Sequence, residues 1–355
     1  MAIDKTKMAI IGFGGMAGYH CENLKKYVQE IEVVGAYDIR EEAKDNIVNA
    51  GMKSYGSPEE LYDDKDVELV LIGTPNNFHK PYAIACLNAG KNVISEKPVT
   101  LNCAELLDIL DVSEKTGKIF TVHHNRRWDS DYLTLKNILR DGVLNKPYTI
   151  ESRVQGSRGA LYGWRGYREN GGGMVLDWGI HLIDQMLNLF PEKVIEIGAH
   201  LHQVFAPEVD DDFTAMFRFE NGLTYIVNIA MNNFILQPRW HMSCEDGTAL
   251  IDNWDVEGKI VKLADPKTME WTEDIVYTSA GPTRSMAPRP KKTVVEIPLD
   301  IVKVNHWPEF YGNVVDAIHG DAELIVKPAQ LVRLMRVIDA VFESDEKKQS
   351  VVCEL

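Results

Sequence analysis

Short, almost continuous apolar runs alternate with segments of helical spacing over the first third of the chain. Strands of a parallel sheet that is covered on both faces are apolar along their whole length, and helices connect them. The pattern therefore predicts an α/β half with strands at residues 7–11, 31–37, 68–72, 92–94 and 119–122. We expect these strands to form a doubly wound parallel sheet in a first domain that covers residues 1–125.

The pattern changes after about residue 145, where polar and apolar side chains alternate in longer runs typical of antiparallel strands. Asn221-Gly222 and Asp246-Gly247 are expected to be the tight turns of two hairpins. Helices are predicted over residues 174–189, 307–319 and 328–342, and a surface loop over the proline-rich, basic residues 281–292. Residues 126–355 are thus expected to form an α+β domain with a large, mainly antiparallel sheet.

The composition is that of an ordinary globular protein and narrows the choice of partners. Of the 355 residues, 45% are hydrophobic and 26% are charged, which argues against global disorder and a fibrous fold. The net charge of -15 repels phosphate backbones and anionic membranes, so we expect no nucleic-acid and no membrane partner. Five scattered cysteines without a C-x-x-C pair argue against a disulfide framework. A soluble, cytoplasmic protein is expected.

The first predicted strand runs directly into a glycine-rich segment that fits the pattern G-x-G-x-x-G/A. The segment consists of Gly12, Phe13, Gly14, Gly15, Met16 and Ala17. In a Rossmann-type fold the first glycine permits a tight turn, the second lets the backbone approach a pyrophosphate, and the last small residue keeps the helix close to the sheet. The alternative is a glycine-rich turn that exists for steric reasons alone.

Asp38 ends the second predicted strand at the position expected for a carboxylate that binds an adenosine ribose. A carboxylate accepts a hydrogen bond from a 2′-hydroxyl and repels a 2′-phosphate, so NAD is favoured over NADP as cofactor. Arg40 partly relieves that repulsion and keeps dual specificity open.

Three further segments carry a family likeness. They are Thr74-Pro75-Asn76-Asn77-Phe78-His79, Glu96-Lys97-Pro98, and residues 171–181, which read GGGMVLDWGIH. Together with Asn125-Arg126-Arg127-Trp128, these segments make the chain resemble the glucose-fructose oxidoreductase/inositol dehydrogenase (Gfo/Idh/MocA) family over nearly its whole length. The resemblance implies that Lys97, Asp177 and His181 are the catalytic set and that the Lys97–Pro98 peptide bond is cis.

The chemistry of an alcohol oxidation suits these three residue types. Such a reaction needs a base for the hydroxyl proton, and histidine has an unperturbed pKa close to neutrality, so His181 is the candidate base. Asp177 lies four residues earlier and shares one helix face with His181, where it can orient the imidazole or hold a substrate hydroxyl. Lys97 would stabilise a developing alkoxide and disfavour a protonated His181. The alternative is a capping or surface Asp-His pair and a solvent-exposed lysine.

The resemblance also implies a set of contacts to cofactor and substrate. Besides the glycine-rich segment, the expected cofactor contacts are Asp38, Arg40, Thr74, Pro75, Asn76, His79, Glu96, Lys97 and Asn125. The expected substrate contacts are Lys97, Asn125, Arg127, Trp164, Arg165, Asp177 and His181. For Arg127 and the Trp164-Arg165 pair, packing of a loop or joining of subunits is an equal alternative.

No metal is expected. His123-His124, His200 with His202, and residues 210–212 offer ligand types, but no pair is joined by a third ligand at a recognisable spacing.

The sequence thus indicates an NAD-dependent dehydrogenase that acts on a secondary alcohol of a cyclic polyol, sugar or sugar derivative. Two alternatives stay open: an enzyme that retains NAD and uses transient oxidation to epimerise or cleave a glycoside, and a non-catalytic NAD-binding regulatory protein. By resemblance, the wide second sheet is expected to join copies into a homodimer or homotetramer.

Overall fold

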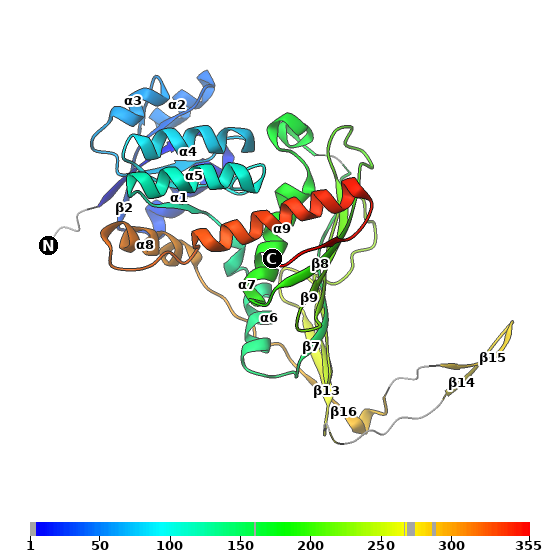
Figure 1. Cartoon of the computed structure of the whole chain (residues 1–355). Coiled ribbons are helices and arrows are strands. Elements are labelled where there is room, and N and C mark those ends of the chain that lie inside the picture. The colour runs from blue at the N-terminus through cyan, green and yellow to red at the C-terminus, as the bar shows by residue number, and fades with distance from the viewer. Residues whose placement is uncertain (1–4, 160, 266, 268–273, 286–288) are drawn as a thin grey trace.

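The computed structural model describes residues 5–159, 161–265, 267, 274–285 and 289–355. Two sheets dominate it, with helices around the first and along one face of the second (Figure 1). The fold is α/β with a Rossmann-like parallel sheet followed by a larger mixed sheet, as expected from the sequence. The division into domains at residue 125 stays a prediction.

The first sheet has six parallel strands in the order β3-β2-β1-β4-β5-β6. Their bounds are β1 Thr6–Ile11, β2 Ile31–Tyr37, β3 Lys53–Ser54, β4 Leu69–Ile72, β5 Asn92–Ser95 and β6 Phe120–Val122. The strands β4, β5 and β6 are buried along their whole length, which explains why apolar residues predominate in them. The strand order reverses at β1, and ligands of such sheets bind at the carboxyl ends of the strands beside that point.

Five helices connect these strands. They are α1 Gly15–Tyr27, α2 Glu41–Asn49, α3 Pro58–Asp63, α4 His79–Asn88 and α5 Cys103–Thr116. Local sequence sets several of their ends: the Asn102 side chain accepts a hydrogen bond from the Glu105 N–H at the start of α5, and Gly117, with φ of 66°, closes the same helix.

The second sheet has nine strands in the order β16-β13-β12-β11-β7-β10-β9-β8-β17. The strands are β7 Pro147–Gln155, β8 Val194–His202, β9 Asp212–Phe219, β10 Thr224–Ala230, β11 Trp240–Cys244, β12 Gly247–Ile251, β13 Gly258–Leu263, β16 Val294–Ile297 and β17 Val351–Val352. Both predicted hairpins are present, as β9–β10 and β11–β12. β7 and β10 are parallel neighbours, and the other neighbouring pairs in this sheet are antiparallel.

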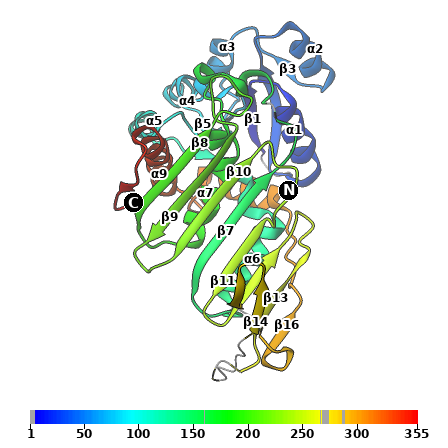
Figure 2. The same ribbon diagram turned by 90° about the vertical axis from the view of Figure 1, so that its right-hand side faces the viewer.

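Helices α6 Ser130–Arg140, α7 Ile180–Leu189 and α9 Pro328–Lys347 lie on one face of this sheet, and the opposite face is turned toward the viewer in Figure 2. Another helix of the second half, α8 His306–His319, packs beside α1 of the first half (Figure 1). A single π-helical stretch, Val175–Gly179, precedes α7. In β9 the residues that face the helices are buried and their neighbours are exposed, which matches the alternation in the sequence.

Helix α9 contacts both halves of the chain (Figure 1). It packs against α5 of the first half and against β8 of the second sheet. The Cys103 N–H at the start of α5 donates to Asp339 Oδ2 of α9 at 3.1 Å, and Thr121 Oγ1 of β6 donates to the Val326 carbonyl oxygen at 3.0 Å.

One element differs from the expectation. Residues 281–292 were expected to form a surface loop, but Gly281–Ser285 is strand β15, which pairs with β14 (Asp274–Thr278) in a two-stranded hairpin. Residues 286–288 lie outside the described residues, and Lys291–Thr293 is one turn of 3-10 helix. Among the described residues, no helix has both the length and the apolar character needed to cross a bilayer.

Candidate active site

The glycine-rich turn between β1 and α1 has the geometry of an anion cradle. Gly12 has φ of 89°, and a Cβ at this position would lie 2.8 Å from the Gly73 carbonyl oxygen. A Cβ on Gly14 or Gly15 would meet nothing within 4 Å, so a ligand can approach the backbone there. No acidic residue lies in the first turn of α1 and no side chain caps it, which leaves its N–H groups free for a pyrophosphate.

Asp38, at the end of β2, lies beside this turn and is already paired. Its Oδ2 accepts from the Phe13 N–H at 2.7 Å, and its Oδ1 accepts from Nε of Arg40 at 3.0 Å. Burial raises the pKa of Asp38, but the hydrogen bonds from Arg40 and Phe13 outweigh it and hold the pKa below its usual value. The Arg40 guanidinium is half-exposed and also donates to the Phe13 carbonyl oxygen at 3.0 Å, so it borders the same turn.

The turn after β4 is hydrogen-bonded to the second half of the chain. Asn76 is buried and its Nδ2 donates to the Gly171 carbonyl oxygen at 2.7 Å, which joins this turn to the glycine run before α7. Thr74 and Pro75 are half-buried beside Gly12.

His79 lies between two of the turns that border the site, and its contact with the cofactor stays a prediction. Its Nδ1 lies 2.7 Å from the Pro98 carbonyl oxygen and its Nε2 lies 3.0 Å from that of Thr74. Both ring nitrogens of this buried side chain therefore lie within hydrogen-bond distance of a backbone carbonyl oxygen, and the neutral imidazole donates its single N–H to one of the two. Burial lowers the pKa of His79. His79 fixes the two turns that border the site.

The Glu96 side chain points into the interior, and its predicted contact with the cofactor stays untested. Its Oε1 contacts His20 Nε2 at 2.7 Å and His123 Nδ1 at 3.0 Å, and Tyr311 is hydrogen-bonded to the other nitrogen of His20. Burial raises the pKa of Glu96, but the two histidines hold it well below its usual value. The three ligand atoms lie within 4.8 Å of one another, and the carboxylate engages one nitrogen of each ring, while Nε2 of His123 is buried without a hydrogen-bond partner in the described part of the chain. This cluster joins α1, β5, β6 and α8, and no sequence pattern indicated His20.

Lys97 and Asp177 meet at the carboxyl end of β5. Lys97 Nζ lies 2.7 Å from Asp177 Oδ1 and donates to the Asp177 carbonyl oxygen at the same distance. Nε of Arg165 lies 3.4 Å from the same Asp177 oxygen. Burial raises the pKa of Asp177, but Lys97 and Arg165 outweigh it, so the carboxyl group is held below its usual pKa. The expected cis peptide bond between Lys97 and Pro98 is present.

The glycine run before α7 makes these contacts possible. A Cβ on Gly172 would lie 2.1 Å from the Arg165 carbonyl oxygen, and one on Gly173 would lie 2.3 Å from Asp210 Oδ1. Asp210 Oδ2 accepts from the Val175 N–H at 2.7 Å, at the beginning of the π-helical stretch. Glycines at these positions let the loop that carries Arg165 pack against the helix that carries Asp177.

His181 lies one turn beyond Asp177 and is 5% exposed. Its Nδ1 is buried and has no hydrogen-bond partner in the part of the chain that the structure describes. Burial, reinforced by the positive charges of Lys97 and Arg126, lowers the pKa of His181 well below its usual value. The imidazole is therefore neutral at physiological pH, which is the state in which it accepts a proton.

Two tryptophans and Arg126 stand beside His181. The Trp178 ring centroid lies 5.6 Å from that of His181 and 5.6 Å from that of Trp254, which follows β12. The Arg126 guanidinium carbon lies 4.9 Å from the Trp178 centroid. Arg126 and Trp178 belong to segments that carry the family likeness, but no role was expected for Arg126, and no sequence pattern indicated Trp254.

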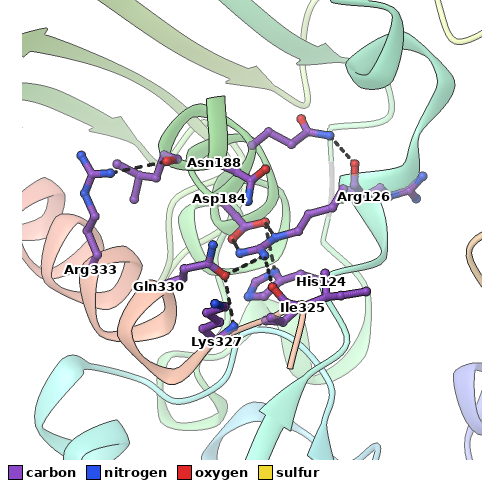
Figure 3. A network of polar contacts seen from close by, with 12 residues as sticks. His124, Arg126, Asp184, Asn188, Ile325, Lys327, Gln330 and Arg333 are labelled. Atoms are coloured by element: carbon purple, nitrogen blue, oxygen red, sulfur yellow. Dashed lines mark hydrogen bonds and ion pairs between the residues drawn. The ribbon is translucent and has the colours of Figure 1, made fainter. Parts of the chain in front are cut away.

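Arg127, which was expected to contact substrate, instead forms a buried ion pair. Its Nε and one terminal nitrogen donate to the two oxygens of Asp184 at 2.8 and 2.6 Å, and the other terminal nitrogen donates to Gln330 at 3.0 Å. Figure 3 shows Asp184, Gln330 and His124 grouped in this interior network. We therefore revise the role of Arg127 from substrate binding to joining α7 and α9.

The remaining expected substrate contacts are open to a ligand. Trp164 is half-buried, and the Arg165 guanidinium carbon lies 4.5 Å from the centroid of its ring. Asn125, at the beginning of the 3-10 turn Asn125–Trp128, is half-buried and its side chain makes no hydrogen bond to the described residues.

A dinucleotide cradle at the switch point of a Rossmann-like sheet, facing a lysine, an aspartate and a neutral histidine, defines an NAD(P)-binding oxidoreductase. The chain belongs to the Gfo/Idh/MocA family: a model described as an oxidoreductase family with an NAD-binding Rossmann fold matches residues 6–124, and the GFO/IDH/MocA C-terminal domain matches residues 132–250.

Individual relatives support this assignment. A solved NAD-binding protein from Listeria innocua is 38% identical, with a TM-score of 0.93 over 99% of this chain and 100% of that one. The scyllo-inositol 2-dehydrogenase (NADP(+)) IolW of Bacillus subtilis is 26% identical over 99% of this chain and 97% of its own length. The myo-inositol 2-dehydrogenase of Thermotoga maritima is 29% identical over 62% of this chain and 67% of its own.

Proposed function

We propose that the protein is an NAD-dependent dehydrogenase acting on a secondary alcohol of a cyclic polyol, sugar or sugar derivative. The observation that carries the proposal is the meeting of Lys97 and Asp177 at 2.7 Å, one helical turn from the neutral, buried His181. Inositol dehydrogenases among the relatives support the substrate class.

Each residue has a defined task in this reaction. His181 takes the hydroxyl proton as the C–H hydride leaves the carbinol carbon, so that the alcohol loses one proton and one hydride and becomes a ketone. Lys97 stabilises the negative charge that develops on the oxygen, and Asp177 holds Lys97 in place. Bound NAD supplies the hydride acceptor. The reverse reaction reduces the ketone with the same groups.

The turn between β1 and α1 supports a dinucleotide, and Asp38 supports NAD as the preferred form. A 2′-phosphate would lie against the Asp38 carboxylate, whose lowered pKa keeps it charged. The half-exposed Arg40 supports some use of NADP.

We also propose that copies associate through the second sheet. The face turned away from α6, α7 and α9 has a hollow of about 500 Å³ lined mostly by polar side chains of β7, β9 and β10. The predicted homodimer or homotetramer would cover this face. Size-exclusion chromatography with light scattering tests it, and a monomer at micromolar concentration would contradict it.

The activity is tested by following nicotinamide reduction with NAD or NADP against inositols, hexoses, glycosides, uronates and nucleotide sugars. We expect His181→Asn to lower kcat by at least about a hundredfold, because a positioned general base contributes roughly 10²–10⁴. His319→Asn is the matched control, since His319 is exposed at the end of α8. A panel in which no secondary alcohol is oxidised would refute the dehydrogenase.

Two other outcomes would redirect the assignment. Product formed without net NADH would support an enzyme that retains its cofactor and uses transient oxidation. NAD binding that survives Lys97→Ala and His181→Asn, with a parent protein inert toward the whole panel, would support a regulatory protein.

A further inference from the structure

The wall beside His181 combines aromatic faces with a cation from three separate parts of the chain. Trp178 comes from the π-helical stretch before α7, Trp254 from the loop between β12 and β13, and Arg126 from the 3-10 turn after β6. The Arg126 guanidinium carbon lies 4.9 Å from the Trp178 ring centroid and 5.6 Å from that of Trp254. Aromatic faces of this kind pack against the C–H groups of a sugar or cyclitol ring.

Arg126 is incompletely neutralised. Its nearest carboxylate belongs to Asp129, and both oxygens of that group accept from the same terminal nitrogen of Arg126, each at 3.3 Å. These hydrogen bonds are longer than those of a bidentate arginine–carboxylate pair, which uses two nitrogens. The Arg126 Nε is buried without a hydrogen-bond partner in the described part of the chain, while the side chain as a whole remains 33% exposed. Burial raises the pKa of Asp129 to about 6, so this counter-ion is charged at neutral pH and loses its charge as the pH falls through 6.

Other charges near the wall have the same sign. Lys97 and Arg165 share the single carboxylate of Asp177. A hollow of about 300 Å³ adjoins Trp178, and its lining in the described residues includes Arg158 and no acidic side chain. The site is thus locally positive within a chain whose net charge is -15. A neutral polyol gives no reason for such an excess of cations.

From these contacts we infer that the substrate is an anion: a cyclic polyol or sugar that carries a carboxylate or a phosphate, with Arg126 as the residue that selects it. The inference rests on the proposed dehydrogenase function and narrows its substrate class. Trp178 and Trp254 pack against the ring, and the planar guanidinium donates two parallel N–H bonds to the acidic group. The reacting hydroxyl then lies toward His181 and Lys97.

The test compares neutral and charged substrates of the same ring: glucose with glucuronate and glucose 6-phosphate, and myo-inositol with an inositol monophosphate. We expect one charged member to exceed its neutral partner in kcat/KM by at least about tenfold, the value of a charge-assisted hydrogen bond. Uronates and phosphates are assayed separately, so the result also identifies which acidic group the site recognises.

Variants of Arg126 separate recognition from structure. Arg126→Met is expected to lower kcat/KM for the charged substrate by about 10- to 100-fold more than for its neutral partner. Arg126→Lys keeps the charge without the planar fork and should fall between the two. Arg140→Met, at an exposed arginine paired with Asp141, is the matched control. Thermal melting verifies that each variant is folded.

The outcomes distinguish this inference from the function on which it rests. Oxidation of neutral and charged substrates with equal efficiency would refute the anion preference and leave the dehydrogenase intact. Equal losses for both substrates in Arg126→Met would make Arg126 a packing residue and overturn its selective role. If no substrate is oxidised, calorimetric titration of the NAD-loaded protein with glucuronate and glucose 6-phosphate decides: binding that Arg126→Met abolishes supports the inference, and no binding overturns it.

Discussion

Replacing Gly12 by alanine is expected to destabilise the fold, whereas the same change at Gly14 is expected to leave the fold intact and weaken cofactor binding. Gly12 has φ of 89°, a region that L-residues rarely adopt, and a Cβ there would lie 2.8 Å from the Gly73 carbonyl oxygen and 2.9 Å from the carbonyl carbon. Both atoms belong to the backbone after β4 and cannot rotate away.

The two effects at Gly12 set the expected magnitude. Holding alanine at such a φ costs about 1–3 kcal/mol, and forcing the two backbones apart costs roughly 1–3 kcal/mol more. A total of about 2–6 kcal/mol is a large part of the ~5–15 kcal/mol that stabilises a folded protein. Gly14 has φ of -91° and open space around its Cβ position, so alanine is accommodated without either cost.

Differential scanning fluorimetry with and without NAD separates the two variants. Gly12→Ala should melt roughly 4–24 °C below the parent without cofactor, at about 2–4 °C per kcal/mol for a unit of 150–250 residues. Gly14→Ala should melt within about 2 °C of the parent but lose most of the stabilisation that NAD gives. If Gly12→Ala melts with the parent, or if Gly14→Ala keeps full NAD stabilisation, the reasoning about this turn is wrong.

Three other substitutions test the buried polar network around Asp184 and the cofactor preference set by Asp38. Arg127→Met should lower the free energy of unfolding by about 3–5 kcal/mol, because it leaves the Asp184 carboxylate buried and unpaired; adding Asp184→Leu should recover most of the loss in urea unfolding. Burial lowers the pKa of His124 from 6.5 to about 4. The unfolded chain thus gains a proton that the folded chain does not, and stability should fall from pH 6.5 to 4 by up to about 1.4 kcal/mol per pH unit; His124→Asn should reduce that slope in urea titrations at several pH values. Asp38→Ala should raise the affinity for NADP relative to NAD, because Arg40 then faces a 2′-phosphate without a competing carboxylate; fluorescence titration with both cofactors would contradict this if the ratio is unchanged.

Local sequence patterns were sufficient for most of the fold. The apolar runs located the buried strands of the first sheet, because a strand that is covered on both faces has no side that turns to water. The Asn221-Gly222 and Asp246-Gly247 pairs located two hairpins, because a two-residue hairpin turn favours these residue types. The strand β15 was missed because its sequence, Gly-Pro-Thr-Arg-Ser, carries the residues of a loop.

The site was harder to predict where tertiary contacts decide the direction of a side chain. Arg126 and Arg127 are neighbours in a 3-10 turn, where successive side chains point about a third of a turn apart. Which arginine meets the buried Asp184 and which meets Trp178 depends on helices more than fifty residues away. The partner of Glu96 in α1, His20, lies 76 residues earlier in the chain and for the same reason left no local signal.

Because α9 lies near the end of the chain, the first half acquires its contacts with α9 late in synthesis. The first sheet is complete in sequence at Val122, yet α5 and β6 receive partners from residues 326 and 339. A ribosome adds roughly 5–20 residues per second, so tens of seconds separate the synthesis of β6 from that of α9. During that interval the surface of α5 that α9 will cover faces the solvent or a chaperone. The first half of the chain is thus finished only when the last helix emerges, and early termination would expose an apolar surface on an otherwise folded domain.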